Sequence, residues 1–334
     1  MLRIGVNGFG RIGRAVTRLS LQRDDIKVVA INGRSSADSH AYLLGYDSVH
    51  GKLPVEIKAS GDKITVGERV ITCFKEDKPE NIPWQEARVD IVIESTGVFK
   101  DRKSASGHLE ESVSKVIISA PSLDVDKTVV MGVNEEEYDQ EKDKIVSNAS
   151  CTTNCLAPLC KLLDENFGIK KGMATTIHAI TSSQSVLDRS NKKDQRLGRS
   201  AINNIIPTTT GAAKAVGQVL PKLVGKIDAM SLRVPVLNGS AVDLKVLLEK
   251  NVTREEVLKT LENSEVTQRG ILEVSKEALV LQDIIGNTSS CIVDSDFVSV
   301  IGDNLVTILA WYDNEIGYSA RLLDLAVYLS DANN

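Results

Sequence analysis

Short runs of Val, Ile and Ala alternate with helical patterns through the first half of the chain. The runs are LRIGVNG, KVVAING, VDIVIEST, KVIISAP, TVVMGVN and KIVSNAS, each bounded by Gly, Asn, Ser or Pro. Between the first two, RAVTRLSLQRDD has helical spacing, with Val16, Leu19 and Ile26 apolar. Strands that alternate with helices are typical of βαβ units and a mostly parallel sheet. We therefore predict a doubly wound α/β domain over residues 1–150.

The second half has a different pattern. One helix, CLAPLCKLLDENFG, is followed by longer strand patterns with few helices between them, namely GMATTIHAI, IDAMSLRVPV, SAVDLKVLLEK and DNLVTILAWYDN. This pattern predicts an α+β domain over 151–315, with an antiparallel sheet and helices on one face. Residues 185–200 are polar and predict a long loop, and such loops are usually functional or disordered. The last segment, 316–334, predicts an amphipathic helix.

Composition narrows the class of partner. The 334 residues are enough for two domains, and a net charge of −5 gives no reason to expect nucleic acid or an anionic membrane as partner. No run approaches the ~20 apolar residues of a spanning helix, and we expect no signal peptide. Five cysteines, an odd number, argue against a disulfide framework and for a reducing compartment, so we expect the cytoplasm.

A glycine fingerprint opens the chain. Gly8, Gly10 and Gly13 fit the pattern G-x-G-x-x-G, with a predicted strand before it and a predicted helix after it. In this context the first glycine makes a tight turn, the second lets the backbone approach a pyrophosphate, and the third lets the helix pack on the strand. The helix N-terminus then offers N–H groups to the phosphates. The alternative is a structural turn, but the context favours dinucleotide binding.

A cysteine stands at the next strand-to-helix junction. Cys151, in SNASCTTNC, begins a predicted helix, where free N–H groups and the helix dipole stabilise a thiolate. Its alternative role is that of a small buried residue, as we expect for Cys155 and Cys160. No Cys/His pair follows at ligand spacing, so we predict no metal site. His178, within the strand pattern TTIHAIT, would supply an acid/base. With a nicotinamide, this pair predicts aldehyde oxidation through a thiohemiacetal and a thioester.

Several longer motifs carry a family resemblance. NGFGRIGR, ASCTTNC, TTTGAAKAVGQVLP, SLRVP and WYDNEIGYS together resemble phosphorylating glyceraldehyde-3-phosphate dehydrogenase, and the similarity extends from Leu2 to about Leu329. The resemblance implies a Rossmann domain, a catalytic α+β domain, a C-terminal helix that returns to the first domain, and a homotetramer. It also implies a phosphorylated aldehyde and inorganic phosphate as substrates.

The resemblance assigns roles residue by residue. Cys151 would be the nucleophile, with His178 as base and oxyanion donor. One phosphate site is implied at Ser150, Thr152, Thr210 and Gly211, and the other at Thr181 and Arg233. Cofactor contacts are implied at Arg11, Ile12, Lys78, Ser119 and Asn314, the last of which would orient the nicotinamide carboxamide. The family pattern changes at Ser183, where Asp is frequent, at Asp77, where Arg is frequent beside the adenine, and at Leu197, so that Arg196 or Arg199 could serve the phosphate site instead.

The stretch INGRSS bears on the choice of cofactor. NAD-dependent members have Asp at position 33, which accepts hydrogen bonds from the ribose hydroxyls. Gly33 removes that carboxylate, and Arg34, with Ser35 beside it, offers donors suited to a 2′-phosphate. In the long loop Ser190 agrees with members that use NADP, and in the family tetramer this loop crosses to a neighbouring subunit's cofactor. We therefore predict NADP, with NAD possible.

Two other functions stay open at this point. Erythrose-4-phosphate dehydrogenase is also extensively similar, although the intact TTTGAAKA and HAIT stretches favour the triose enzyme. The other alternative is a cofactor-binding regulator or adhesin with little catalysis. The presence together of Cys151, His178, Thr181, Arg233 and Asn314 argues against that as the primary role.

Overall fold

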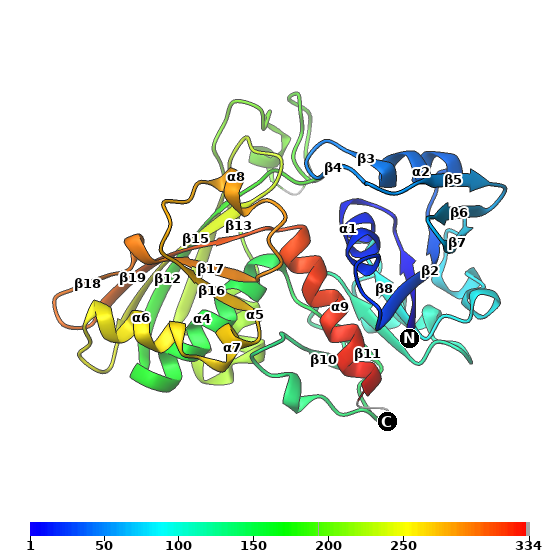
Figure 1. Ribbon diagram of the computed structural model, residues 1–334. Coiled ribbons are helices and arrows are strands. Elements are labelled where there is room, and N and C mark those ends of the chain that lie inside the picture. Colours follow the sequence, from blue (N-terminus) through cyan, green and yellow to red (C-terminus); the bar gives the residue numbers. More distant parts are fainter. Residues whose placement is uncertain (193, 332–334) are drawn as a thin grey trace. The chain divides into compact units, whose positions relative to one another are not determined.

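The chain forms two compact units, seen in the computed structural model of Figure 1, which describes residues 1–192 and 194–331. The first unit comprises Met1–Met131, Glu135–Ala149 and the segment from Ser319 onward. The second comprises Gly132–Asn134 and Ser150–Tyr318. Each unit is built around a sheet of its own.

The first unit contains a nine-stranded sheet in the order β10-β11-β9-β8-β1-β2-β7-β6-β5. Its strands are β1 (Leu2–Asn7), β2 (Ile26–Asn32), β5 (Ile57–Ser60), β6 (Lys63–Val66), β7 (Arg69–Phe74), β8 (Ile91–Glu94), β9 (Lys115–Ile118), β10 (Lys127–Thr128) and β11 (Ile145–Ser147). The pairs from β10 through β7 are parallel, and β5, β6 and β7 form an antiparallel extension. The order reverses at β1, so the carboxyl ends of β1, β2 and β8 meet at one edge, where open α/β sheets bind their ligands.

The helices of this unit follow the predicted alternation. They are α1 (Arg11–Ser20), α2 (Ala37–Gly45), α3 (Arg102–Ala105) and most of α9 (Ile316–Asp331), with a small hairpin of β3 (Tyr46–Asp47) and β4 (Gly51–Lys52) after α2. Two local predictions were wrong. Ile26 begins β2 instead of continuing the helical pattern, because α1 already ends at Ser20. The run TVVMGVN contributes only Thr128 to a strand, since β10 has two residues.

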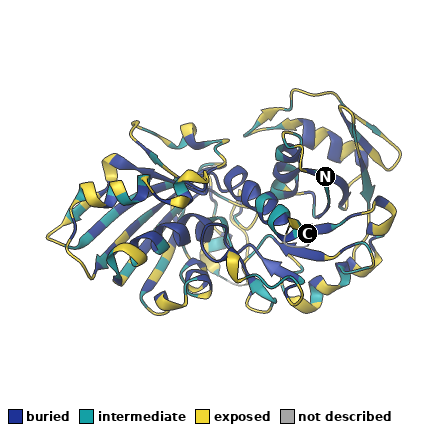
Figure 2. Cartoon of the chain, turned by 60° about the horizontal axis from the view of Figure 1, so that its bottom comes forward, coloured by how far each residue is buried: buried dark blue, intermediate teal, exposed yellow. Residues whose placement is uncertain are grey.

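The central strands of the first unit are buried on both faces, as expected of a covered parallel sheet. Figure 2 shows these strands in dark blue. At β1 the packing is tight around Trp84, which is fully buried. A Cβ added to Gly5 would lie 2.8 Å from the Trp84 ring, so this strand position requires a glycine.

The second unit contains an eight-stranded sheet in the order β13-β14-β12-β15-β19-β17-β16, with β18 paired to β19. Its strands are β12 (Ile169–His178), β13 (Ile206–Thr209), β14 (Ile227–Arg233), β15 (Ser240–Leu248), β16 (Leu272–Ser275), β17 (Cys291–Asp294), β18 (Ser299–Ile301) and β19 (Leu305–Tyr312). The sheet is mixed and not purely antiparallel as predicted, because β12 runs parallel to β14 and β16 runs parallel to β17.

One long helix, α4 (Cys151–Phe167), covers this second sheet. The other helices of the second unit are α5 (Ala212–Val219), α6 (Arg254–Glu262), α7 (Glu265–Gln268) and α8 (Leu281–Ile284). α4 packs on β12, β15, β17 and β19, and α5 and α6 pack against α4. The predicted fold class, a Rossmann domain followed by an α+β domain and a C-terminal helix, is confirmed. Among the described helices, none has the length and apolar character needed to cross a membrane.

Candidate active site

Cys151 is the first residue of α4. Ser150 caps the helix, because its side-chain oxygen accepts a hydrogen bond from the Thr153 backbone N–H at 3.1 Å. The preceding residue, Ala149, has φ of 53°, a left-handed conformation that is costly for a residue other than glycine. The thiol is therefore held at a capped helix start by a turn of unusual geometry.

His178 faces this thiol. It is the last residue of β12, and its Nε2 lies 3.4 Å from Sγ of Cys151. Its Nδ1 lies 2.7 Å from the Ala179 carbonyl oxygen and 2.6 Å from Nη1 of Arg233. In the tautomer protonated at Nδ1, the ring donates to the Ala179 carbonyl, which also accepts from Arg233 Nη1, and its Nε2 lone pair faces the thiol. In the other tautomer Nδ1 accepts from Arg233 and Nε2 carries the proton. Only the tautomer protonated at Nδ1 can accept the thiol proton.

Sheet register explains why a guanidinium stands beside the histidine. β12 and β14 are parallel, and His178 and Arg233 are register partners at the ends of the two strands. Arg233 Nη1 also donates to the Ala179 carbonyl at 3.1 Å, whereas its buried Nε has no hydrogen-bond partner among the described residues. No carboxylate within the described ranges pairs with this guanidinium. It therefore presents a positive charge suited to an anionic ligand.

The charge states follow from burial and from Arg233. Burial raises the pKa of the Cys151 thiol, while the Arg233 charge and hydrogen bonds at the helix start oppose that rise. Burial, together with the Arg233 charge, lowers the pKa of His178 to about 3, so the ring is neutral at pH 7. The sequence predicted a stabilised thiolate. At the Cys151 thiol burial outweighs the helix start and raises the pKa, so the thiol and the imidazole form a neutral pair at pH 7.

Of the residues expected to bind phosphate, Thr152 is placed differently from the others. Its hydroxyl is buried and lies 2.9 Å from the Tyr312 hydroxyl, which lies 2.8 Å from that of Thr176. The Thr152 hydroxyl is thus engaged in the core. Sequence reasoning missed Tyr312, although it stands within the motif WYDN.

The remaining phosphate candidates have accessible polar groups. Thr181 is exposed, and its hydroxyl lies 2.9 Å from that of Ser183. Thr210 caps the turn before α5, where its hydroxyl accepts from the Ala212 N–H at 3.2 Å. Gly211 precedes α5 with no atom within 4 Å of an added Cβ. Open space at a helix start leaves room for a phosphate oxygen near its N–H groups.

Asn314 is connected to the strand that carries His178. Its Oδ1 accepts a hydrogen bond from Oγ of Ser240 at 2.9 Å, and Ser240 Oγ accepts from the Ala179 backbone N–H at 3.2 Å. Because the carbonyl oxygen of the Asn314 amide is engaged, the orientation of the side chain is fixed. Its NH₂ group is the end not used in these bonds.

The long loop, residues 185–200, has internal ties of its own. Arg189 donates to Ser185 Oγ at 2.6 Å, and Arg199 pairs with Asp188 at 3.1 Å. Ser190 is exposed. Arg196 is also exposed, and no ion pair to its side chain is present within the described ranges. Of the three loop arginines it is therefore the one whose charge is most available to a phosphate.

In the first unit the fingerprint glycines meet three different demands. Gly8 has φ of 93°, and an added Cβ would lie 2.6 Å from the Thr96 backbone N. At Gly13 the Cβ would lie 2.4 Å from the Gly8 carbonyl oxygen. At Gly10 nothing lies within 4 Å. The first and third glycines are therefore required by the chain itself, whereas the space at the second suits a pyrophosphate.

The helix after the fingerprint supplies the other pyrophosphate groups. Arg11 and Ile12 are the first residues of α1, so their backbone N–H groups are among those without an intrahelical acceptor. The Arg11 side chain is engaged elsewhere, since its Nη1 lies 2.5 Å from Asp47 Oδ2. Only backbone contacts to a pyrophosphate were predicted for these residues, and this arrangement fits them.

Residues after β2 form the second part of the nucleotide site. Arg34 is exposed, with its Nε 3.7 Å from Oδ1 of the equally exposed Asp77, a weak pair in water. Ser35 and Lys78 are also exposed, and Ser119 follows β9 at the same carboxyl edge of the sheet. The position before Arg34 carries no side chain, so no carboxylate stands where a ribose acid is usual.

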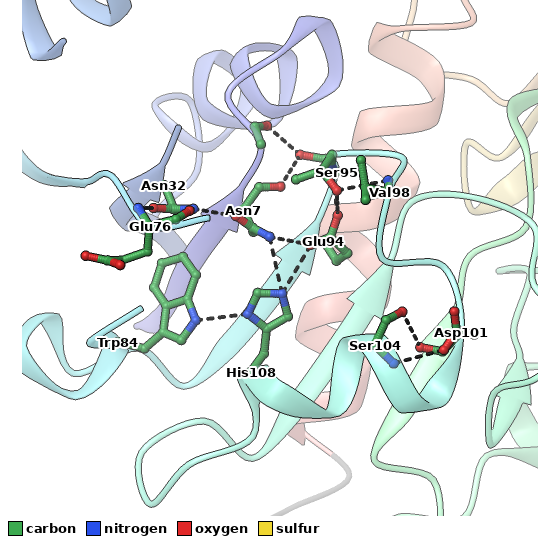
Figure 3. Close-up of polar contacts among 12 residues, drawn as sticks. Asn7, Asn32, Glu76, Trp84, Glu94, Ser95, Val98, Asp101, Ser104 and His108 are labelled. Atoms are coloured by element: carbon green, nitrogen blue, oxygen red, sulfur yellow. Dashed lines mark hydrogen bonds and ion pairs between the residues drawn. The ribbon is translucent and has the colours of Figure 1, made fainter. Parts of the chain in front are cut away.

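A buried polar network lies beneath the fingerprint, and sequence reasoning missed it (Figure 3). The Glu94 carboxylate, at the end of β8, accepts from Asn7 Nδ2 at 2.5 Å and from the Thr96 backbone N–H at 2.7 Å, and it also contacts the Thr96 hydroxyl. Trp84 Nε1 donates to His108 Nδ1 at 3.2 Å. An indole can only donate, so the other ring nitrogen of His108 carries the proton and donates to Glu94 at 3.1 Å.

The network joins the ends of three strands. Asn7 ends β1 and its Oδ1 accepts from Asn32 Nδ2, at the end of β2, at 2.8 Å. Ser95, directly after β8, donates to the Gly8 carbonyl at 2.7 Å. The fingerprint turn is thus attached to the strands on both sides of it.

Across residues 1–192 and 194–331, no group of His, Cys, Asp and Glu is arranged to hold a metal ion.

Comparisons with known proteins agree with this arrangement. Family models described as the NAD binding domain and the C-terminal domain of glyceraldehyde 3-phosphate dehydrogenase match residues 2–102 and 150–314. The chain is 50% identical over 330 residues to a glyceraldehyde-3-phosphate dehydrogenase of Geobacillus stearothermophilus, covering 98% of each chain. It is also 50% identical over 335 residues to a cytosolic one of Arabidopsis thaliana, covering 99% of this chain and 98% of the relative.

The Glu94 network predicts a cost for losing its charge. In Glu94→Gln one acceptor oxygen becomes a donor that faces other donors, so we expect the free energy of unfolding to fall by about 1–3 kcal/mol. Exchange of the Thr96 amide hydrogen, measured by mass spectrometry, should accelerate. Glu86→Gln, at an exposed position, is the control and should change neither quantity. Equal behaviour of the two variants would contradict the role given to the network.

Arg233 predicts a change in thiol reactivity. Removing its charge in Arg233→Gln should raise the pKa of Cys151, because the guanidinium favours the thiolate. An opposite charge this close shifts the pKa of a neighbouring group by about one unit or more. Alkylation of Cys151 by iodoacetamide at pH 7, followed by mass spectrometry, should therefore slow about tenfold. Arg196→Gln, in the exposed loop, should leave the rate unchanged. A rate unaffected by loss of Arg233 would contradict the electrostatic account.

Proposed function

The chain belongs to the glyceraldehyde-3-phosphate dehydrogenase family and is an NAD(P)-dependent phosphorylating oxidoreductase, and we propose that it works through Cys151 and prefers NADP. The reaction is the reversible oxidative phosphorylation of glyceraldehyde 3-phosphate to 1,3-bisphosphoglycerate. The observation that supports the catalytic part is the contact of 3.4 Å between Cys151 Sγ and His178 Nε2.

The thiol and the imidazole act together on the aldehyde. As Sγ of Cys151 attacks the carbonyl carbon, the thiol proton passes to His178 Nε2, which returns it to the carbonyl oxygen to give a thiohemiacetal. His178 then removes the hydroxyl proton as the substrate is oxidised, leaving a thioester on Cys151. A phosphate oxygen attacks the thioester carbon, the C–S bond breaks to release the acyl phosphate, and His178 returns its proton to the departing thiolate.

Arg233 and the nearby hydroxyls and N–H groups account for binding the two phosphates. We assign one phosphate to Arg233 and Thr181, because the guanidinium has no carboxylate partner within the described ranges and Thr181 is exposed. The other is assigned to Ser150, Thr210 and the backbone at Gly211, with Thr152 contributing its backbone and not its buried hydroxyl.

The cofactor assignment uses residues at the carboxyl edge of the first sheet and Asn314, which follows β19 of the second. The backbone at Gly10, Arg11 and Ile12 would hold the pyrophosphate, and the NH₂ group of Asn314 would hold the carboxamide. When bound, the nicotinamide supplies the hydride acceptor for the oxidation. Lys78 and Ser119 would line the nucleotide and would take no part in the chemistry.

The preference for NADP rests on the residues after β2. A 2′-phosphate has roughly −1.5 to −2 charges at neutral pH, and a carboxylate at position 33 would repel it. Gly33 removes that charge, and the exposed guanidinium of Arg34 has only a weak pair to give up. Ser35 adds a hydroxyl donor. Ser190 would contribute across a homotetramer, an assembly that stays a prediction, as does the cytoplasmic location.

The thioester can be tested directly. With glyceraldehyde 3-phosphate and NADP⁺ but no inorganic phosphate, the acyl group should accumulate on Cys151 and be detected by mass spectrometry after an acid quench. Cys151→Ser should show no adduct. His178→Asn should form the adduct about 10²–10⁴-fold more slowly, the range expected for loss of a general base. An acyl group on another residue would contradict the mechanism.

The cofactor preference is tested by initial rates. We expect kcat/KM to be higher for NADP⁺ than for NAD⁺ in the wild type. Arg34→Leu should lower kcat/KM for NADP⁺ about tenfold or more, the worth of charged hydrogen bonds, and leave NAD⁺ nearly unchanged. Lys75→Leu removes a nearby exposed charge and is the control. A wild type that prefers NAD⁺ would contradict the proposal, and activity on erythrose 4-phosphate alone would change the substrate.

A further inference from the structure

A histidine of the next helix fills the space beside the backbone at position 33. His40 lies on α2, and its ring is next to the Gly33 backbone. A Cβ added to Gly33 would lie 2.7 Å from His40 Nε2 and 2.9 Å from Cε1. Real Cβ atoms essentially never approach other atoms within 3.0 Å, so the imidazole occupies the space that a side chain at position 33 would need.

Packing holds the ring in that place. His40 is 6% exposed, and it meets the equally buried Phe9 edge to face, with ring centroids 5.2 Å apart. Phe9 is the residue between the first two fingerprint glycines. A new side chain at position 33 would therefore have to move a ring that is packed against the fingerprint turn predicted to hold the pyrophosphate.

The edge of the ring that faces Gly33 is polar. Nε2 is buried and makes no hydrogen bond of normal geometry to the described residues. Burial lowers the pKa of His40, against an opposing effect of the Gly33 backbone, so the ring is neutral at pH 7. A carboxylate introduced at position 33 would find this nitrogen as its nearest polar neighbour. An acid there would be displaced by the ring from the place where it could meet the ribose hydroxyls.

We propose that His40 is a positioning residue for cofactor specificity. Its ring occupies the space that a side chain at position 33 would need, and so prevents an acid there from binding the ribose hydroxyls of NAD. The inference rests on the proposed preference for NADP. It makes Gly33 and His40 a coupled pair. Restoring the acid alone would harm NADP⁺ binding without creating a site for NAD⁺, whereas restoring the acid and removing the imidazole would create one.

The test is a double-mutant cycle on the full chain with wild type, Gly33→Asp, His40→Leu and the double variant. For each protein, kcat/KM is measured with glyceraldehyde 3-phosphate and phosphate for both cofactors, and Kd for each cofactor is measured by calorimetry. We expect Gly33→Asp to lose NADP⁺ binding and gain little for NAD⁺. The double variant should bind and use NAD⁺ about tenfold better than Gly33→Asp, within the range of coupling for residues in contact.

Two controls keep the result interpretable. Gly33→Asp/Tyr42→Leu changes an exposed ring on the same helix and should behave like Gly33→Asp alone. If Gly33→Asp does not fold, Gly33→Ala, which adds only the Cβ, replaces it, and its loss of binding for both cofactors should be relieved by His40→Leu. A general loss of stability would not change the ratio of NADP⁺ to NAD⁺ constants.

The outcomes separate the two proposals. If Gly33→Asp alone uses NAD⁺ as well as the double variant does, the inference about His40 is wrong, while a wild type that prefers NADP⁺ upholds the proposed function. If the wild type prefers NAD⁺, the proposed cofactor is wrong. In that case a coupling energy between Gly33 and His40 in the NAD⁺ constants would still support the steric relation between the two residues. If the two substitutions acted independently on NAD⁺, that relation would be overturned.

Discussion

The parallel pairing of β12 with β14 is the constraint on which the proposed chemistry depends. Because the two strands run in the same direction and in register, His178 and Arg233 reach the sheet edge together. Burial and then the guanidinium lower the pKa of the histidine, and the guanidinium also favours the thiolate of Cys151 and carries a charge suited to an anion. An antiparallel neighbour would set the end of one strand against the start of the other. The same residues would then form no site.

The first unit depends in a comparable way on strand ends that meet. Asn7, Asn32 and Glu94 end three neighbouring strands and are joined by buried hydrogen bonds. A buried carboxylate is stable only when donors surround it, so this edge of the sheet tolerates little variation. Above that fixed base stand the open space at Gly10 and the exposed Arg34, which are suited to a ligand and not to the core. The buried residues that fix the strand ends and the open positions suited to a ligand are thus neighbours in the chain.

Much of this could be predicted from the sequence, because local patterns carry it. The glycine fingerprint, the cysteine at a helix start and the strand that contains His178 are each visible within about ten residues, although the end of that strand at His178 was not predicted. What could not be predicted depends on contacts distant in sequence. The parallel pair β12–β14 is set by sheet topology, and the pairing of His108 with Trp84 and Glu94 joins residues from separate loops. The burial of the Thr152 hydroxyl depends on Tyr312, which lies 160 positions away.

That last contact bears on the catalytic helix between turnovers. The first turn of a helix has N–H groups without intrahelical acceptors and is the part that frays most readily. Here the Tyr312 hydroxyl bridges Thr152 in that turn and Thr176 in β12, two residues before His178. The Cys151 thiol and the His178 ring are thereby carried on elements tied to one phenol. Their alignment is built into the core, so it does not have to be re-formed each time a substrate arrives.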